Sequence, residues 1–182
     1  MTRIGYFRKT RSSNRVLVSL FEEIQQLRSE STYQDWQEQG FVRKLTSLEK
    51  LARKKILILL KSKKLKTSDD FLRAADIFHH GPDFQSYMIA VALAAISNHL
   101  GEPWGKNHFA VAIDRLLQSL GLPQHFGTQY SKIKGKWQLD KVDLKTTDKE
   151  RLEYGVEPIR LLKKRVRDMD KGITFWKTEL KD

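Results

Sequence analysis

The chain has 182 residues, of which 34 are lysine or arginine and 22 are aspartate or glutamate, so its net charge is +12. It has no cysteine, which excludes disulfide scaffolds, iron–sulfur clusters, thiolate zinc sites and cysteine nucleophiles. Apolar residues make up 40% of the chain, enough for a folded core that needs no disulfide and no metal. We expect no cofactor. The excess of positive charge favours anionic partners.

Export and membrane signals are weak. The longest apolar-rich stretches, residues 56–60 and 87–96, are shorter than the ~18 to 20 residues that span a bilayer. Residues 1–15 carry five basic residues and no acidic one, and Glu22 and Glu23 interrupt the apolar run that follows. We therefore expect a soluble, cytoplasmic protein with a basic arm over residues 1–15 and no membrane partner.

Two basic helices are predicted within residues 16–66. Apolar residues recur at helical spacing from residue 14 to about 30, and Asn14 is placed to cap this helix. After a polar segment, the same spacing returns from residue 42 to about 64, where the face opposite the apolar one is strongly basic. We expect these N-terminal helices to pack on the core of the chain.

The main helical domain is predicted over residues 67–172. Residues 67–70 form a helix-start signal, and a Gly-Pro pair ends the helix that follows. Asp83 caps an alanine-rich helix over residues 84–100, which we expect to be the central and most buried one because small side chains let helices approach closely. A further helix follows from about residue 106 to 120.

The pattern changes after Pro123. Residues 130–139 alternate around Gly135 and predict a short β-hairpin, and two helices follow it before a tail at residues 173–182. The sequence therefore predicts an all-α fold, an irregular bundle of six or seven helices in helical-hairpin pairs with one short β-hairpin near residues 130–139.

Polar residues in the main domain suggest a site. His80 and Asp83 flank the Gly-Pro turn, where the imidazole could either be a structural partner of Asp83 at the end of its helix or act with it as acid and base. Asp114 and Arg115 lie within an apolar helix, and a buried charge must be paired and hydrogen-bonded. We expect one of the pair to point inward, either in an internal salt bridge that ties the nearby loop or the His80 turn to the bundle or facing a ligand; simple exposure is the third alternative.

An irregular segment supplies further candidates with free backbone amides. The catalytic hypothesis uses His80, Asp83 and Asp114. The ligand-binding hypothesis uses Arg115, Gln124, Gly127, Thr128 and Gln129, with the guanidinium of Arg115 binding an anionic group. No metal site is expected, because the chain lacks H-x-x-x-H and H-E-x-x-H spacings, and it also lacks phosphate-binding glycine loops.

Several short motifs follow one another from residue 70 to about 169. They read A-x-I-x-H-H-G at 75–81, A-x-D-R at 112–115, G-x-P-Q-x-F-G-T-Q at 121–129, Trp137, and D-x-x-R-x-x-x-G-V-x-P-I at 148–159. In order and spacing this region resembles a bacterial domain family of unknown function. The resemblance implies a recurring polar set, formed here by His80, Asp114, Arg115, Gln124, Gly127, Thr128 and Gln129. His79 stands where the family has Gln, and the resemblance implies no activity.

Three functions are consistent with these residues. The first is a polar pocket for a small anionic or peptide ligand, which could also be catalytic. The alternative is a basic module that binds nucleic acid or an acidic protein, because ten basic residues lie between positions 43 and 66. Its predicted patch consists of Arg43, Lys44, Arg53, Lys54, Lys55, Lys63 and Lys64. In the third, the bundle is a scaffold and the polar cluster only fastens the loop that follows Pro123.

Overall fold

The computed structural model describes residues 13–31 and 35–172, and within them the chain is an all-α bundle with one small antiparallel hairpin, as predicted. The basic arm up to residue 12 and the tail from residue 173 lie outside the described residues. The elements, in order, are α1 (Arg15–Glu30), the 3-10 helix η1 (Asp35–Gln37), α2 (Gln39–Lys61), α3 (Ser68–His79), α4 (Phe84–His99), α5 (Gly105–Ser119), β1 (Tyr130–Ile133), β2 (Lys136–Leu139), α6 (Asp148–Glu153) and α7 (Ile159–Asp170).

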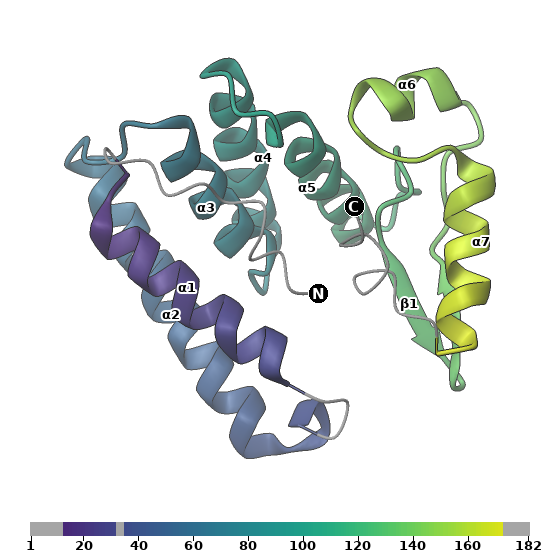
Figure 1. Cartoon of the computed structure of the whole chain (residues 1–182), viewed down its shortest axis with the longest axis horizontal. Helices are drawn as coiled ribbons and strands as arrows, with labels where there is room; N and C mark the ends of the chain where they lie inside the picture. The colour runs from purple at the N-terminus through teal and green to yellow at the C-terminus, as the bar shows by residue number, and fades with distance from the viewer. Residues whose placement is uncertain (1–12, 32–34, 173–182) are drawn as a thin grey trace, which may run out of the picture.

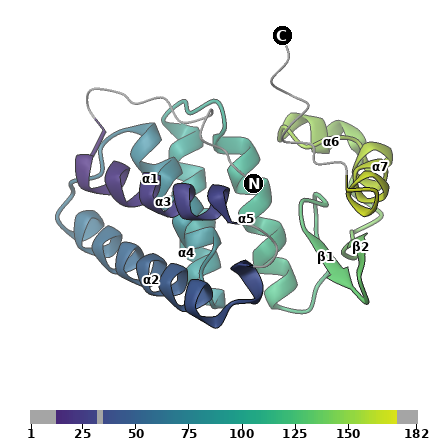
Figure 2. The ribbon, with the colours of Figure 1, turned by 60° about the horizontal axis from the view of Figure 1, so that its bottom comes forward.

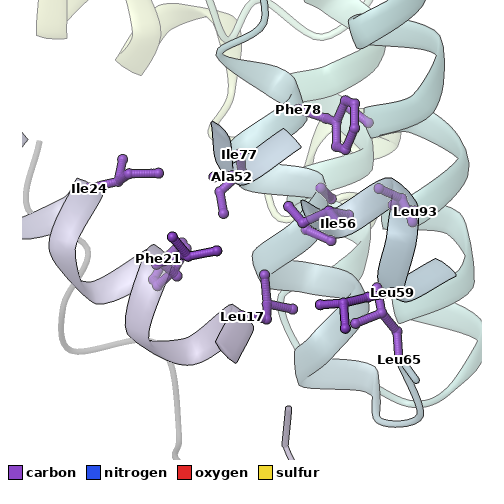
Figure 3. Packing of buried hydrophobic residues seen from close by; sticks show 14 of the residues in the cluster. Leu17, Phe21, Ile24, Ala52, Ile56, Leu59, Leu65, Ile77, Phe78 and Leu93 are labelled. Carbon is purple, nitrogen blue, oxygen red and sulfur yellow. The ribbon is translucent and has the colours of Figure 1, made fainter. Parts of the chain in front are cut away.

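The helix α1 begins where the sequence predicts. The side-chain oxygen of Asn14 accepts hydrogen bonds from the backbone amides of Val16 and Leu17, which would otherwise lack helical partners. Helices α1 and α2 lie side by side at one end of the molecule (Figures 1 and 2). Their apolar faces meet α3 and α4 in one core cluster, in which Phe21 of α1 and Ile56 of α2 are buried (Figure 3).

The most buried helix is α3 and not α4, so this expectation from the sequence was wrong. Ten of the twelve residues of α3 are buried, because α1, α2, α4 and α5 all pack around it. Helix α4 packs against α3 and α5 and leaves part of its apolar surface exposed. A helix that is apolar on all sides does not show by its sequence which side its neighbours will cover.

Helix α5 forms the boundary between two apolar clusters. Its residue Ala112 belongs to the core shared by α1 to α4, whereas Ala110 packs with Phe126, Val156 and Leu162 in a second cluster. The hairpin, α6 and α7 lie on the side of α5 away from α1 and α2 (Figures 1 and 2). The division of the chain at residue 66 remains a prediction.

Helices α4 and α5 approach each other closely at a glycine. A Cβ atom on Gly105 would lie 2.5 Å from the Cα of Asn98, too close for any side chain. The first turn of α5 can therefore lie directly against the last turn of α4, which fixes where α5 begins. No helix within residues 13–31 and 35–172 is long and apolar enough to cross a bilayer.

Candidate functional site

A buried carboxylate in the middle of α5 holds the loop that follows this helix. Asp114 is fully buried, and its Oδ1 accepts hydrogen bonds from the backbone amides of His125 at 2.7 Å and Phe126 at 2.8 Å. Its Oδ2 accepts from the amides of Gly127 at 2.9 Å and Thr128 at 2.8 Å, and from the Thr128 hydroxyl at 2.8 Å. Five donors thus replace the water that the charge loses on burial.

Asp114 is therefore the residue of the Asp114–Arg115 pair that points into the protein. The sequence suggested an internal salt bridge as one way to tie down the loop. Instead, backbone amides fasten it, and Asp114 makes no ion pair with any residue that the structure describes. Consecutive amides can converge on one carboxylate because Gly127 takes a positive φ of 89° and turns the backbone around it.

Two glutamines close the same loop from the other side. Gln124 is fully buried; its Oε1 accepts from the backbone amide of Gln129 at 2.7 Å, and its Nε2 donates to the carbonyls of Gln129 and Asp140. The side chain of Gln129 donates to the Thr128 hydroxyl at 2.9 Å. Of the predicted site residues, Asp114, Gln124, Gly127, Thr128 and Gln129 are thus brought together in one hydrogen-bonded unit, which we call the Asp114 loop.

A buried arginine that the sequence did not single out supports this unit. Arg151 is 2% exposed; its Nε donates to the carbonyl of Phe126 at 3.0 Å and its Nη1 to the carbonyl of Thr146 at 2.7 Å. Nearby, Nε2 of His125 forms a hydrogen bond with Oε1 of Glu150 at 2.9 Å, and this bond lowers the pKa of the Glu150 carboxyl. Arg151 lies in the D-x-x-R motif, and that motif was the available signal for its role.

Arg115 lies beside the Asp114 loop but outside its hydrogen bonds. Its side chain is half-buried, and its buried Nε has no hydrogen-bond partner among the described residues. Tyr130, the first residue after the loop, is largely buried, and this burial raises the pKa of its hydroxyl to about 12.

His80 and Asp83 lie in the turn between α3 and α4, and both are exposed. The His80 ring packs edge-on against His79, with ring centroids 4.7 Å apart. Asp83 caps α4: hydrogen bonds from the hydroxyl and the amide of Ser86 lower the pKa of its carboxyl, with help from Arg53 of α2.

The structure does not link this turn to the Asp114 loop. No hydrogen bond or ion pair in the described part of the chain joins His80 or Asp83 to Asp114, Arg115 or residues 124–129. The catalytic use of His80, Asp83 and Asp114 as one site stays a prediction, and no hydrogen bond or ion pair among the described residues supports it.

A second buried polar network joins α1, α2, α3 and α5, and it was not identified from the sequence. Oδ2 of Asp76 in α3 accepts a hydrogen bond from Nε2 of Gln25 at 2.7 Å and lies 3.8 Å from Nη1 of Arg28. Its Oδ1 lies 3.8 Å from Nε2 of His108. Arg28 also pairs with Glu49 of α2 at 2.6 Å. This network joins four helices across the core, and a polar residue within each apolar pattern was the only sequence signal for it.

The predicted basic patch lies largely on the exposed face of α2 and the loop after it. Six of its residues are exposed: Arg43, Lys44, Lys54, Lys55, Lys63 and Lys64. Arg53 differs, because its side chain is 11% exposed and lies 3.7 Å from Glu49. Glu49 is the one acidic residue of α2, and it is buried and paired with arginines. The exposed lysines of α2 form no ion pair with any described residue.

A groove runs between α1 and α2 beside this patch. It has a volume of about 560 Å³, and Val16, Leu20, Leu48 and Leu51 form its apolar part. Arg15, Lys55 and Glu23 are its charged residues, with Ser19 between them. Val16 is 48% and Leu51 45% exposed, so apolar side chains reach the surface next to the exposed Lys55.

Neither a metal site nor a relative identifies the chemistry. Among residues 13–31 and 35–172, no cluster of three or more histidine, aspartate or glutamate residues could hold a metal ion. Comparisons with protein-family models, with curated proteins and with solved structures found no match to this chain. The resemblance to a family of unknown function therefore stays a prediction.

Proposed function

We propose that this protein is a binding module for an acidic, amphipathic segment of a partner protein, which docks on α2 and in the groove between α1 and α2. The observation that carries the proposal is that exposed lysines, which form no ion pair with any described residue, lie among exposed aliphatic side chains on the solvent face of α2. A basic helix face whose only role is solubility would carry charged and polar side chains, whereas exposed apolar side chains beside the charges are typical of an interaction surface.

The charges of α2 support an anionic partner. Arg43, Lys50, Lys54 and Lys61 recur at intervals of seven, four and seven residues, so they lie along one face of the helix. This row is about 27 Å long at the rise of an α-helix. No acidic side chain of α2 faces it, because Glu49 is buried on the opposite side.

The apolar residues favour a protein over a nucleic acid. Leu51, Leu57 and Ile58 of α2 are 45%, 40% and 60% exposed and flank the row of lysines. Phosphate groups gain nothing from aliphatic side chains, whereas an amphipathic helix buries its leucines in such a surface and directs its acidic residues at the lysines. Glu23 in the groove would then select a basic or polar residue at one position of the partner.

The Asp114 loop supports the scaffold interpretation better than the pocket interpretation. Both carboxylate oxygens of Asp114 accept hydrogen bonds from groups of the same chain, and so does the side-chain oxygen of Gln124, whose amide nitrogen donates two more. A group that binds ligands needs free donors or acceptors, and this unit offers few.

Fluorescence anisotropy tests the proposal. The probe is a labelled helical peptide of about 20 residues with leucine at every third or fourth position and glutamate elsewhere, because such a peptide presents one apolar and one acidic face. We expect binding that weakens as salt is raised from about 0.05 to 0.3 M, since exposed charges are screened. A peptide of the same composition in scrambled order should bind at least about fivefold more weakly, because it cannot fill the groove.

Two pairs of variants locate the binding surface. Leu51→Ser should weaken binding about fivefold, because Leu51 is about half exposed and only that part of its side chain can gain hydrophobic free energy on binding. Leu144→Ser is the control, at a loop residue that is 95% exposed and lies outside the groove, and it should leave binding unchanged. Lys55→Gln should weaken binding about two- to fivefold, and Lys163→Gln on exposed α7 removes the same charge without effect. Equal binding of the two peptides, or preferred binding of a single-stranded oligonucleotide, would refute the proposal.

A further inference from the structure

One face of α7 is entirely basic. Its residues follow Arg160 at intervals of three, four, seven and eleven positions, which places them within a sector of about 100° around the helix and along about 16 Å of its axis. All of them are exposed, whereas the apolar residues of α7 are buried or half-buried. This surface, which we call the α7 face, consists of Arg160, Lys163, Lys164, Arg167 and Lys171, the last at the C-terminal cap.

Two acidic residues border the α7 face, and each is engaged within the chain. Oδ2 of Asp168 pairs with Nζ of Lys164 at 2.8 Å. On the other border, Oδ1 of Asp170 accepts a hydrogen bond from the backbone amide of Trp137 at 2.7 Å. The four cations other than Lys164 form no ion pair with any residue that the structure describes, so their charges are available to a partner.

The hairpin adds further cations beyond the C-terminal end of α7. The hydrogen bond between Asp170 and Trp137 holds strand β2 against this end, and the two elements lie side by side at the edge of the molecule (Figures 1 and 2). The tip of the hairpin carries Lys134 and Lys136, both exposed, and residues 130–139 contain no acidic residue. Cations from α7 and from the hairpin therefore line the same edge of the molecule.

The composition of the α7 face favours nucleic acid over a protein helix or a lipid surface. Unlike α2, α7 has no exposed apolar side chain, so neither an amphipathic helix nor the acyl layer of a membrane would find an anchor there. Phosphate groups need only cations and hydrogen-bond donors. The planar guanidinium groups of Arg160 and Arg167 can each donate two hydrogen bonds to one phosphate.

The same face favours a double strand over a single strand. Single strands gain affinity by stacking their bases on aromatic side chains, and α7 has no aromatic residue. A DNA duplex presents one phosphate charge per roughly 1.7 Å of its axis whatever its sequence, so a rigid row of cations always meets a regular row of anions. Contacts of this kind position a protein on the duplex without reading its bases.

We propose that the α7 face and the tip of the hairpin bind the phosphate backbone of double-stranded nucleic acid, without preference for sequence. This surface is separate from the groove between α1 and α2, so the inference does not depend on the peptide binding proposed above. The acidic peptide needs apolar anchors, which α7 lacks, whereas the duplex needs only charges. Each of the two proposals can therefore fail while the other one holds.

Fluorescence anisotropy with a labelled DNA duplex of about 20 base pairs and mixed sequence tests the inference. Each phosphate contact changes the logarithm of the affinity by about 0.9 per tenfold change in salt. With four available cations on the α7 face, we expect the affinity to fall about hundredfold between about 0.05 and 0.2 M salt. One of the two strands alone should bind at least about threefold more weakly than the duplex, because it has fewer charges per length and finds no stacking platform.

A pair of double variants locates the surface. Lys163→Gln combined with Lys171→Gln removes two contacts, so it should weaken duplex binding at least about tenfold at about 0.1 M salt and reduce the salt slope by about 1.8. The matched control combines Lys66→Gln, in the loop after α2, with Lys106→Gln at the start of α5. It should change the affinity less than about threefold and leave the slope unchanged. All four lysines are exposed, so both double variants should keep the circular dichroism spectrum of the unmodified chain.

Several results would overturn the inference. An equal loss of affinity in the two double variants would mean that the net charge of the chain attracts the duplex from every side. Tighter binding of the single strand, or an equal effect of the single variants Lys55→Gln and Lys163→Gln on duplex binding, would contradict the assignment to α7. Displacement of the duplex by polyglutamate of equal charge would mean that this face accepts any polyanion.

Discussion

Replacing Asp114 with asparagine should destabilise the protein strongly, because the side chain is the shared acceptor of the Asp114 loop. The carboxylate accepts two hydrogen bonds at Oδ1 and three at Oδ2. In Asp114→Asn one of these oxygens becomes an NH2 group, which donates and cannot accept. The best arrangement keeps the amide oxygen at the Oδ2 position and leaves the backbone amides of His125 and Phe126 without an acceptor.

The expected loss follows from these two amides. A buried donor that loses its acceptor costs about 1 to 3 kcal/mol, so the two together cost about 2 to 6 kcal/mol. The Phe126 amide is buried and the His125 amide partly buried, so the first should contribute more than the second. A loss of this size is a large part of the roughly 5 to 15 kcal/mol that stabilises most domains, and it should lower the melting temperature by roughly 5 to 20 °C.

Urea unfolding followed by circular dichroism measures this loss. The matched control is Glu153→Gln, which removes the same charge from a residue whose side chain is 62% exposed and lies 3.9 Å from Lys106. This control should change the free energy of unfolding by less than about 0.5 kcal/mol. If Asp114→Asn lost less than about 1 kcal/mol, the amides would not depend on the carboxylate, and the structural role assigned to it would be wrong.

Three further predictions concern the surroundings of the same loop. Gly127→Ala should destabilise the fold by about 1 kcal/mol or more, because the residue has a φ of 89° and the new Cβ would lie 3.0 Å from Leu162; thermal unfolding measures this, and an unchanged melting temperature would contradict it. The free energy of unfolding should fall as the pH rises from 10 to 12, because the pKa of the Tyr130 hydroxyl is about 12 in the folded chain and near 10 in the unfolded one, so the unfolded chain releases the proton first. Tyr130→Phe should show a smaller fall over this range, and identical pH profiles of the two proteins would count against burial as the cause. Arg151→Met should cost about 2 to 5 kcal/mol in urea unfolding, because it leaves the carbonyls of Phe126 and Thr146 without a donor, and a loss below about 1 kcal/mol would contradict this role.

Helix ends were predictable because their signals are local. Thr67 caps α3 and Thr147 caps α6, each by accepting a hydrogen bond from an amide three residues later and each in a complete capping box. The hairpin was predictable for the same reason, since its turn needs only two residues with positive φ, Lys134 and Gly135. Such contacts depend on residues a few positions apart, which a sequence displays directly.

The candidate site was predictable only in part. The sequence showed that an inward charge at Asp114 or Arg115 would need partners, and it marked the polar segment that supplies them. It could not show that backbone amides would satisfy Asp114, because a backbone amide is present at every position except proline. Arg151 and the network around Asp76 were missed because their partners lie on other elements, and in sequence they look like ordinary charges of helix surfaces.

The sequence by itself determined the all-α class, the capped starts of α1, α3 and α4, the hairpin and the basic face of α2, because these follow from periodicity, capping and charge within single segments. The bounds of α2, which lacks a capping side chain, were predicted three residues too late at both ends. Only the tertiary structure decided that α3 is the central helix and that α4 keeps exposed apolar side chains. It also decided that, among the described residues, no hydrogen bond or ion pair joins His80 or Asp83 to the Asp114 loop. The reason is physical. Periodicity tells which face of a helix avoids water, but the number and direction of its neighbours depend on how all the helices pack at once.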